Sequence, residues 1–204
     1  MTAQILCPPR PKNAAATRHA MLVAARRRFL QESYENVGLR DIAGDAGVDV
    51  ALVGRYFGSK EELFKEVLRG DGEDKLPLDS AAADLPARLT SLVMEHDSDH
   101  DRDNVERLLI ILRSASSPKA AEIVRGALNE DVLAPLAGLL SGPDASERAS
   151  LALALLMGST ILRTVMAVEP LCQGDCTIGP KMEQLFRAAL SETAAHPIAA
   201  GAGR

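Results

Sequence analysis

The sequence has few of the features that mark enzymes, secreted proteins or membrane proteins. Its 204 residues contain no glycine-rich phosphate loop, nucleophile elbow or strand-framed pair of carboxylates, so an enzyme ranks last among the function classes. Only three cysteines occur, and no apolar signal region opens the chain, which favours a reduced, cytoplasmic compartment. No segment has a convincing strand pattern, so we expect an all-α fold.

Basic residues are fewer than acidic residues in the whole chain, and they are concentrated in its first third. The formal net charge is -5, yet residues 1–70 carry 11 Lys and Arg against 8 Asp and Glu, whereas the remainder carries 12 against 20. The first third of the chain is therefore basic and the rest acidic. We expect a small basic domain that is attracted to phosphates and an acidic body that is kept away from them.

Long hydrophobic runs are limited to residues 151–168. Gly158, Ser159, Thr160 and Arg163 interrupt this run, which is also short for the roughly 20 residues of a membrane-spanning helix. We interpret it as a buried helix and expect no membrane partner.

Residues 38–57 have the chemistry of a helix-turn-helix. Gly47 suits the left-handed end of one short helix, and Asp49 suits the start of the next. The apolar side chains that the two helices and their turn would share are Ile42, Ala43, Val48, Val53 and Phe57. A second helix held in this way fits the major groove of DNA.

The candidate DNA-binding residues lie on the outward face of this second helix and beside it. Arg55, Tyr56 and Lys60 are suited to DNA contacts, including phosphates. The full set of candidates is Arg40, Val50, Ala51, Leu52, Gly54, Arg55, Tyr56 and Lys60. The alternative is a helix-turn-helix core that only packs against another protein.

These motifs resemble the N-terminal domain of tetracycline-repressor (TetR) type transcription regulators over roughly the first third of the chain. The matching residues are Phe29-Leu30, Tyr34, Ile42-Ala43, Ala46-Gly47-Val48, Tyr56-Phe57 and Gly58-Ser59-Lys60-Glu61. The resemblance implies that Lys60 and Tyr56 grip the DNA backbone while the outward helix face reads bases. Gly54 stands in place of a usual tyrosine and Gly38 in place of a usual capping threonine, so we expect altered operator preference or weaker affinity.

The helical pattern predicts two domains. Residues 13–70 would form the DNA-binding domain and residues 79–196 a C-terminal effector-binding and dimerisation domain, with disordered tails at 1–12 and 197–204. The basic, proline-rich first tail has the composition of an arm that reaches a minor groove or of a simple solvated end. The helices that we expect span 13–31, 59–69, 85–96, 104–114, 118–140, 145–168 and 180–195, with a kink or break at Pro135.

The last two predicted helices favour a homodimer. They are rich in alanine and leucine, and Ala152, Ala154 and Gly158 permit close approach of another helix. In the family that the chain resembles, such helices pair into a four-helix interface, and a two-fold dimer fits a palindromic operator. The alternative is that both helices belong only to the core of one chain.

Arg163 is the most informative polar residue of the C-terminal region, because an unpartnered charge in an apolar helix is costly. Its partner would be an acidic side chain, a helix end or an anionic effector. The candidate effector pocket is lined by Leu92, Leu108, Leu112, Arg113, Met157, Ile161 and Arg163.

Two further clusters are interpreted as loops without a metal. Residues 94–103 collect histidines and carboxylates but offer no cysteine and no second ligand cluster, so we expect a polar interhelical loop. Cys172 and Cys176 are separated by three residues, whereas redox and zinc pairs have two, and Gly174 favours a loop there. We therefore expect no metal and no cofactor.

The sequence as a whole predicts a homodimeric DNA-binding transcription regulator. We expect double-stranded operator DNA and a small-molecule effector as its partners, with release from DNA on effector binding, the behaviour most common in the resembling family. The alternative is a helical small-molecule-binding or adaptor protein whose DNA affinity has been weakened.

Overall fold

The computed structural model describes residues 14–70, 84–94, 99–172 and 175–192. These residues form helices and no strand, which confirms the all-α prediction. The chain divides into two compact units, Met1–Val67 and Leu68–Arg204. The domain bounds 13–70 and 79–196 stay a prediction, and the two predicted tails lie outside the described residues.

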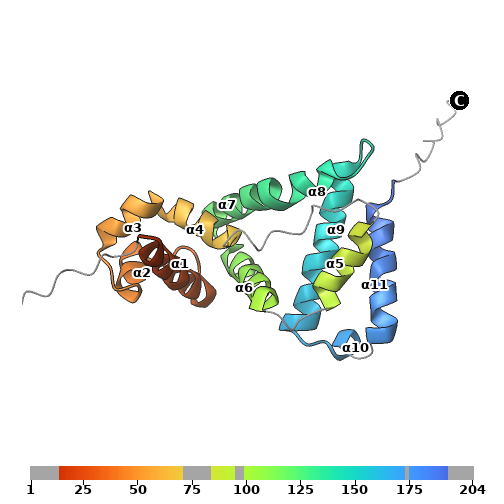
Figure 1. The fold of residues 1–204 in the computed structure, drawn as a ribbon, viewed down its shortest axis with the longest axis horizontal. Coiled ribbons are helices and arrows are strands. Elements are labelled where there is room, and N and C mark those ends of the chain that lie inside the picture. The colour runs from red at the N-terminus through yellow and green to blue at the C-terminus, as the bar shows by residue number, and fades with distance from the viewer. Residues whose placement is uncertain (1–13, 71–83, 95–98, 173–174, 193–204) are drawn as a thin grey trace, which may run out of the picture. The chain divides into compact units, whose positions relative to one another are not determined.

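Unit 1 contains the predicted helix-turn-helix. Its helices are α1 (Ala14–Gln31), α2 (Leu39–Asp45), α3 (Val50–Phe57) and α4 (Lys60–Arg69), of which α4 ends two residues inside unit 2 (Figure 1). Met21, Ala25 and Phe29 are buried on one face of α1, as their spacing of four residues predicts. Helix α1 begins at Ala14, and residue 13, where the sequence predicts its start, lies outside the described residues.

Three aromatic rings fill the core of unit 1. The ring centroid of Phe64 lies 4.7 Å from that of Phe29 and 4.9 Å from that of Tyr34, both in tilted or edge-on geometry. All three side chains are buried. Edge-on pairs place the positive rim of one ring against the negative face of another, so the cluster has a preferred geometry as well as a large buried area.

Unit 2 is built from helices that begin with α5 (Leu85–Met94). In chain order the others are α6 (Asp99–Ser114), α7 (Pro118–Leu128), the π-helical turn η2 (Asn129–Leu133), α8 (Ala134–Gly138), α9 (Ala145–Thr160), the π-helical turn η3 (Ile161–Val165), α10 (Glu169–Cys172) and α11 (Asp175–Leu190). Helices α5, α9 and α11 pack side by side (Figure 1). Their aliphatic side chains surround Phe186, which is fully buried.

The helix predicted over 118–140 is interrupted before Pro135. Residues 129–133 adopt a π-helical turn, after which α8 carries Pro135 in its first turn. Proline lacks the amide hydrogen that an inner helical position must donate, and a first-turn position leaves that hydrogen unpaired in any case. The predicted break is therefore confirmed.

The loop predicted over 94–103 is wrong at its second half. Residues 99–103 begin α6, while 95–98 lie outside the described residues. The first turns of helices tolerate acidic residues well, so the carboxylates of this stretch do not prevent a helix. The loop predicted at Gly174 lies outside the described residues. Cys172 ends α10 and is exposed, and Cys176 lies in α11, which starts five residues before the predicted start at Pro180. Among the described residues no group of three potential metal ligands occurs.

The helical stretch 145–165 is less buried than the sequence analysis predicts. It is the one stretch of the described residues that is long and apolar enough to cross a membrane, and only 22% of its most apolar window is buried within the chain. Arg148 and Arg163 both lie in this stretch. The prediction of a buried helix is therefore wrong for a single chain, and an apolar surface is left for a partner to cover.

Candidate DNA-binding site

The turn between α2 and α3 has the predicted geometry. Gly47 has a φ of +65°, a left-handed conformation that glycine adopts without a Cβ penalty. Asp49 precedes α3 in extended conformation, and its Oδ1 accepts a hydrogen bond of 2.7 Å from the amide of Ala51. The amide of Val48 also bonds back to the carbonyl of Ala43 at 3.0 Å, which ties the turn to α2. These bonds fix the direction in which α3 leaves the turn.

Helix α3 is anchored on one side and open on the other. Val53 and Phe57, one helical turn apart, are buried together with Ile42 and Ala43 of α2. On the open side the structure leaves Val50, Ala51 and Arg55 exposed and Leu52, Gly54 and Tyr56 half-buried, while Arg40 of α2 is also exposed. The open side thus offers apolar atoms for base methyl groups and one guanidinium for a base edge or phosphate.

Helix α2 begins without a side-chain cap. Gly38 occupies the N-cap position in extended conformation and makes no side-chain hydrogen bond to the helix. This confirms the cap loss expected from the sequence. A Cβ at this position would lie 2.7 Å from Oδ2 of Asp41, so the glycine also leaves room for that carboxylate.

Lys60 opens α4 and is held by an aromatic ring. Its Nζ lies 4.4 Å from the ring centroid of Tyr34, a cation–π contact that restricts the side chain. Burial, assisted by the nearby charge of Glu61, raises the pKa of Tyr34 to about 12. Lys60 is therefore a positioned cation at the start of α4, which follows α3 after two residues.

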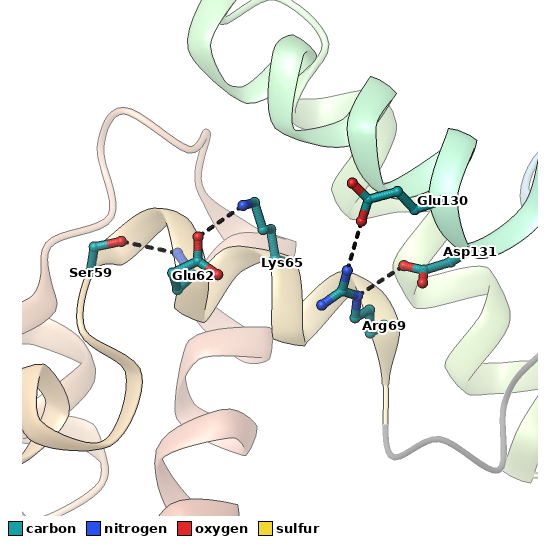
Figure 2. Close-up of polar contacts among 6 residues, drawn as sticks. All are labelled: Ser59, Glu62, Lys65, Arg69, Glu130 and Asp131. Carbon is teal, nitrogen blue, oxygen red and sulfur yellow. Dashed lines mark hydrogen bonds and ion pairs between the residues drawn. The ribbon is translucent and has the colours of Figure 1, made fainter.

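Ser59 caps the start of α4. Oγ of Ser59 accepts a hydrogen bond of 3.1 Å from the amide of Glu62, which is one half of a capping box (Figure 2). The Glu62 carboxylate turns to the next part of the helix, where Oε1 lies 2.8 Å from Nζ of Lys65. Glu62 is thus held by Ser59 through its amide and by Lys65 through its carboxylate, and both contacts stabilise the first turns of α4.

A polar clamp that sequence reasoning missed joins α1 to the end of α2. Nε and Nη2 of Arg28 donate to the two carboxylate oxygens of Asp45 at 2.7 and 2.9 Å, and Nη2 of Arg27 lies 3.1 Å from Oδ2. Glu32 adds a second carboxylate at 3.2 Å from Arg28 Nη1. Hydrogen bonds from Arg28 and then Arg27 lower the pKa of Asp45 to about 2, and the same pairing raises the pKa of Arg28.

The clamp uses two of the three consecutive arginines at positions 26–28 of α1. Arg27 and Arg28 are engaged by Asp45, which lies 17 residues after Arg28 in the sequence. Helical periodicity relates residues three or four apart, so it gives no signal for such a pair. Arg18, also on α1, lies over the Phe57 ring with its Cζ 5.2 Å from the centroid and pairs with Glu66.

The candidate pocket residues of unit 2 are placed differently from one another. Leu108 is buried, Leu92, Met157 and Ile161 are half-buried, and Leu112 and Arg113 are exposed. Arg163 is half-buried, and its Nη1 and Nη2 donate to the carbonyl oxygens of Leu171 at 2.6 Å and Met94 at 3.2 Å. The partner of Arg163 is thus the backbone at the ends of α10 and α5, where unpaired carbonyl groups accumulate.

Comparison with known proteins identifies the class to which this arrangement belongs. Residues 21–67 match the family model of "bacterial regulatory proteins, tetR family", and residues 83–176 match that of "tetracyclin repressor-like, C-terminal domain". Together the two models cover more than half of the chain. The chain belongs to the TetR family and is a DNA-binding transcriptional regulator.

Individual relatives agree with this assignment. The HTH-type transcriptional regulator BetI of Agrobacterium fabrum is 31% identical over 152 residues, which are 69% of this chain and 73% of that protein. NalD of Pseudomonas aeruginosa, the secondary repressor of a multidrug efflux pump, has the same fold with a TM-score of 0.64 at 19% identity, over 86% of this chain and 97% of NalD.

SmeT, solved in complex with triclosan, gives a TM-score of 0.61 at 21% identity, over 85% of this chain and 91% of SmeT. Regulators of the family bind operator DNA, act as dimers and bind small-molecule effectors. The family consists of DNA-binding regulators and not of enzymes.

Proposed function

We propose that this protein is a homodimeric repressor that binds a palindromic operator through α3 and leaves it when a small molecule binds unit 2. The observation that carries the proposal is the turn at Gly47, because it presents the open side of α3 while Val53 and Phe57 hold the other side in the core. The proposal includes a cytoplasmic location and no catalytic activity.

Within the site, we assign different roles to α3 and to the start of α4. Val50, Ala51 and Arg55 are exposed on the first two turns of α3 and are suited to base edges. Lys60, positioned over Tyr34, is suited to a phosphate, with Tyr56 beside it. Arg40 on α2 is a second candidate for the backbone, and Leu52 and Gly54 complete the face.

The assignment of Lys60 is tested by comparison with Lys65, a lysine of the same helix that pairs with Glu62. Lys60→Ala should weaken binding to operator and random duplexes to a similar degree and reduce the salt slope by about 0.9, the value for one lost phosphate contact. Lys65→Ala should leave both unchanged. Fluorescence anisotropy titrations at several salt concentrations measure these quantities.

Arg55→Ala should act differently, because a base contact is lost only on the correct sequence. We expect about a tenfold or larger loss on the operator and a small loss on random duplexes. The wild-type protein can be tested on many duplexes, including the region upstream of its own coding sequence. If it binds none of them, the proposal is replaced by the alternative of an adaptor or small-molecule-binding protein without DNA affinity.

The dimer interface that we propose is the uncovered side of α9 and α11. Leu151 of α9 and Leu185 of α11 are 60% and 53% exposed in the single chain, and Ala154 and Ala188 are exposed beside them. Apolar side chains of this size on adjacent helices are typical of surfaces that a second copy covers. Replacing both leucines by glutamate should give a monomer in sedimentation experiments, whereas Val23→Glu, at an equally exposed valine of α1, should leave the dimer intact.

We propose that a polar clasp at the end of α4 carries the effector signal. Nη2 of Arg69 lies 3.0 Å from Oε2 of Glu130, and its Nε lies 3.0 Å from Oδ2 of Asp131 (Figure 2). Nη1 of Arg107 on α6 donates to the Arg69 carbonyl at 3.2 Å. Both carboxylates belong to η2, a π-helical turn, and such turns occur often at functional sites. A shift of η2 or α6 would therefore move the end of α4.

The clasp predicts a loss of regulation without a loss of DNA binding. Arg69→Ala should keep operator affinity in the absence of effector but reduce the effector-induced release, because the end of α4 no longer follows η2. Arg187→Ala is the matched control, since Arg187 pairs with Glu183 on the surface of α11. An Arg69→Ala protein that is released as fully as the wild type would contradict the proposed coupling.

The composition of unit 2 narrows the effector class. Phe186 is the one aromatic residue of the chain after position 67, and its side chain is fully buried. Aromatic cages that recognise quaternary ammonium groups need several accessible rings. We therefore propose an apolar or amphipathic effector contacted by aliphatic side chains such as Leu92, Leu108, Met157 and Ile161, and calorimetry with apolar and quaternary ammonium compounds tests this choice.

A further inference from the structure

The recognition helix contains a glycine that the fold of the protein does not require. Gly47 and Gly58 have φ values of +65° and +77°, which explain why glycine occupies those positions. Gly54 lies in the middle of α3 in helical conformation, and the amide of Gly58 bonds to its carbonyl at 2.8 Å. A Cβ built at Gly54 would find no heavy atom within 4 Å apart from its chain neighbours and the helix's own nearby backbone.

A glycine at such a position weakens the helix. Within a helix, glycine loses more backbone freedom on folding than alanine does, and α3 has only eight residues. Because neither backbone conformation nor steric contact calls for glycine at position 54, the fold alone gives no reason for this loss of stability. A close contact of the helix with a partner from outside would supply such a reason.

The position of Gly54 on α3 indicates that outside partner. Gly54 is half-buried and lies one helical turn after the exposed Ala51 and directly before the exposed Arg55. The buried residues Val53 and Phe57 lie directly before it and one turn after it, so Gly54 lies at the edge of the open side of the helix. A missing side chain on this side allows the helix backbone to come nearer to an opposing surface by about the width of a methyl group.

We propose that Gly54 is a specificity-determining residue, whose missing side chain lets the middle of α3 approach the DNA closely enough for a base edge or sugar to occupy the free space. This inference rests on the proposed function, since it assigns α3 to the major groove. Gly54 then permits a close contact between the helix backbone and the DNA, which a side chain at this position would block. A side chain at this position would then hold the helix away from the base pairs on which Arg55 and Ala51 depend.

Gly44 provides a matched control on the helix before the turn. It is the second-to-last residue of α2, it is exposed, and a Cβ built there also has no heavy atom within 4 Å. Gly44→Ala and Gly54→Ala therefore add the same atom, and both replace a helical glycine by a better helix former. They differ in that only position 54 lies on the recognition helix.

The test uses the full-length protein and a duplex selected from a random library by the wild-type protein. Thermal unfolding of both variants should occur at a higher temperature than that of the wild type. Affinity for the selected duplex, measured by fluorescence anisotropy, should fall at least about tenfold for Gly54→Ala and stay within about twofold for Gly44→Ala. Affinity for a random duplex should change little in either variant.

Three results would overturn the inference. One is a Gly54→Ala protein that binds the selected duplex as well as the wild type or better, and another is an equal loss in Gly44→Ala. The third is a lower unfolding temperature for Gly54→Ala, because position 54 would then not be free of protein contacts. If the wild-type protein selects no duplex at all, the proposed function itself is wrong, which is a different outcome from a failure of Gly54→Ala alone.

Discussion

Units 1 and 2 are both helical, but they obtain their rigidity in different ways. Five of the six aromatic residues belong to unit 1, where Phe29, Tyr34 and Phe64 pack together and Tyr34 also supports Lys60. Unit 2 has an aliphatic core around Phe186, and its helices are interrupted by the π-helical turns η2 and η3. The difference matches a unit that must present one fixed surface and a unit that must adapt to a ligand.

The largest effect should come from breaking the aromatic cluster. Phe64→Ala removes a fully buried ring, which typically costs about 3–5 kcal/mol, and this loss should unfold unit 1 and abolish DNA binding. Unit 2 should stay folded, so sedimentation should still show a dimer. Phe186→Ala is the matched change in unit 2 and should instead weaken the dimer. Operator binding that survives Phe64→Ala would show that unit 1 does not depend on its rings.

An intermediate effect should come from the buried arginine of unit 2. Arg148 is almost fully buried and connects α9 to its surroundings through the Asp144 carboxylate and the carbonyls of Leu190 and Ser141. Arg148→Ala leaves the buried carbonyl of Leu190 and the partly buried acceptors of Asp144 and Ser141 without their charged donor, and we expect a loss of roughly 3 kcal/mol in the free energy of unfolding.

The control for Arg148 is Arg187→Ala, in which an exposed ion pair with Glu183 is lost. That change should cost less than about 0.5 kcal/mol. Urea unfolding followed by circular dichroism measures both variants. Equal losses in the two would mean that burial of the Arg148 guanidinium has no part in the stability of unit 2.

The smallest effect should be the acid response of the clamp in unit 1. The pKa of Asp45 is lowered to about 2 by Arg28 and Arg27, whereas an aspartate in an unfolded chain has a pKa near 3.8. The carboxylate therefore stabilises the folded state above about pH 4, and this contribution is lost as the pH falls from about 4 towards 2.

Asp45→Asn removes this contribution at all pH values. The unfolding temperature of the variant should lie below that of the wild type at pH 6, and the gap should narrow as the pH approaches 2. We attribute this pH dependence to the Asp45 carboxylate because Arg27 and Arg28 both donate to it. A gap that stays constant with pH would show that the ionisation of Asp45 does not contribute.

Local chemistry allowed the helix-turn-helix to be predicted well. Gly47, Asp49 and Ser59 act within three residues of their own positions, so their turn and cap roles could be read directly from the sequence. The break before Pro135 was predictable for the same reason. The spacing of buried residues along α1 and α3 likewise depends on neighbours three or four positions apart.

The features that escaped prediction depend on distant contacts. Asp45 meets Arg28 only because α1 and α2 fold together, and Arg163 finds its carbonyl partners 8 and 69 residues away. The burial of the 145–165 stretch was overestimated, because hydrophobicity reports that a surface will be covered and not whether the same chain covers it. The π-helical turns have no sequence pattern that sets them apart from ordinary helix.

The most direct test of the account is a footprint of the wild-type protein on its selected duplex, combined with the mass of the complex. We expect two protected half-sites related by a two-fold axis, with centres about one helical turn (about 10 bp) or a multiple of it apart, and an even number of chains per duplex. A single protected site bound by one chain, or no protection at low salt, would contradict the claim that two copies of α3 read the operator together.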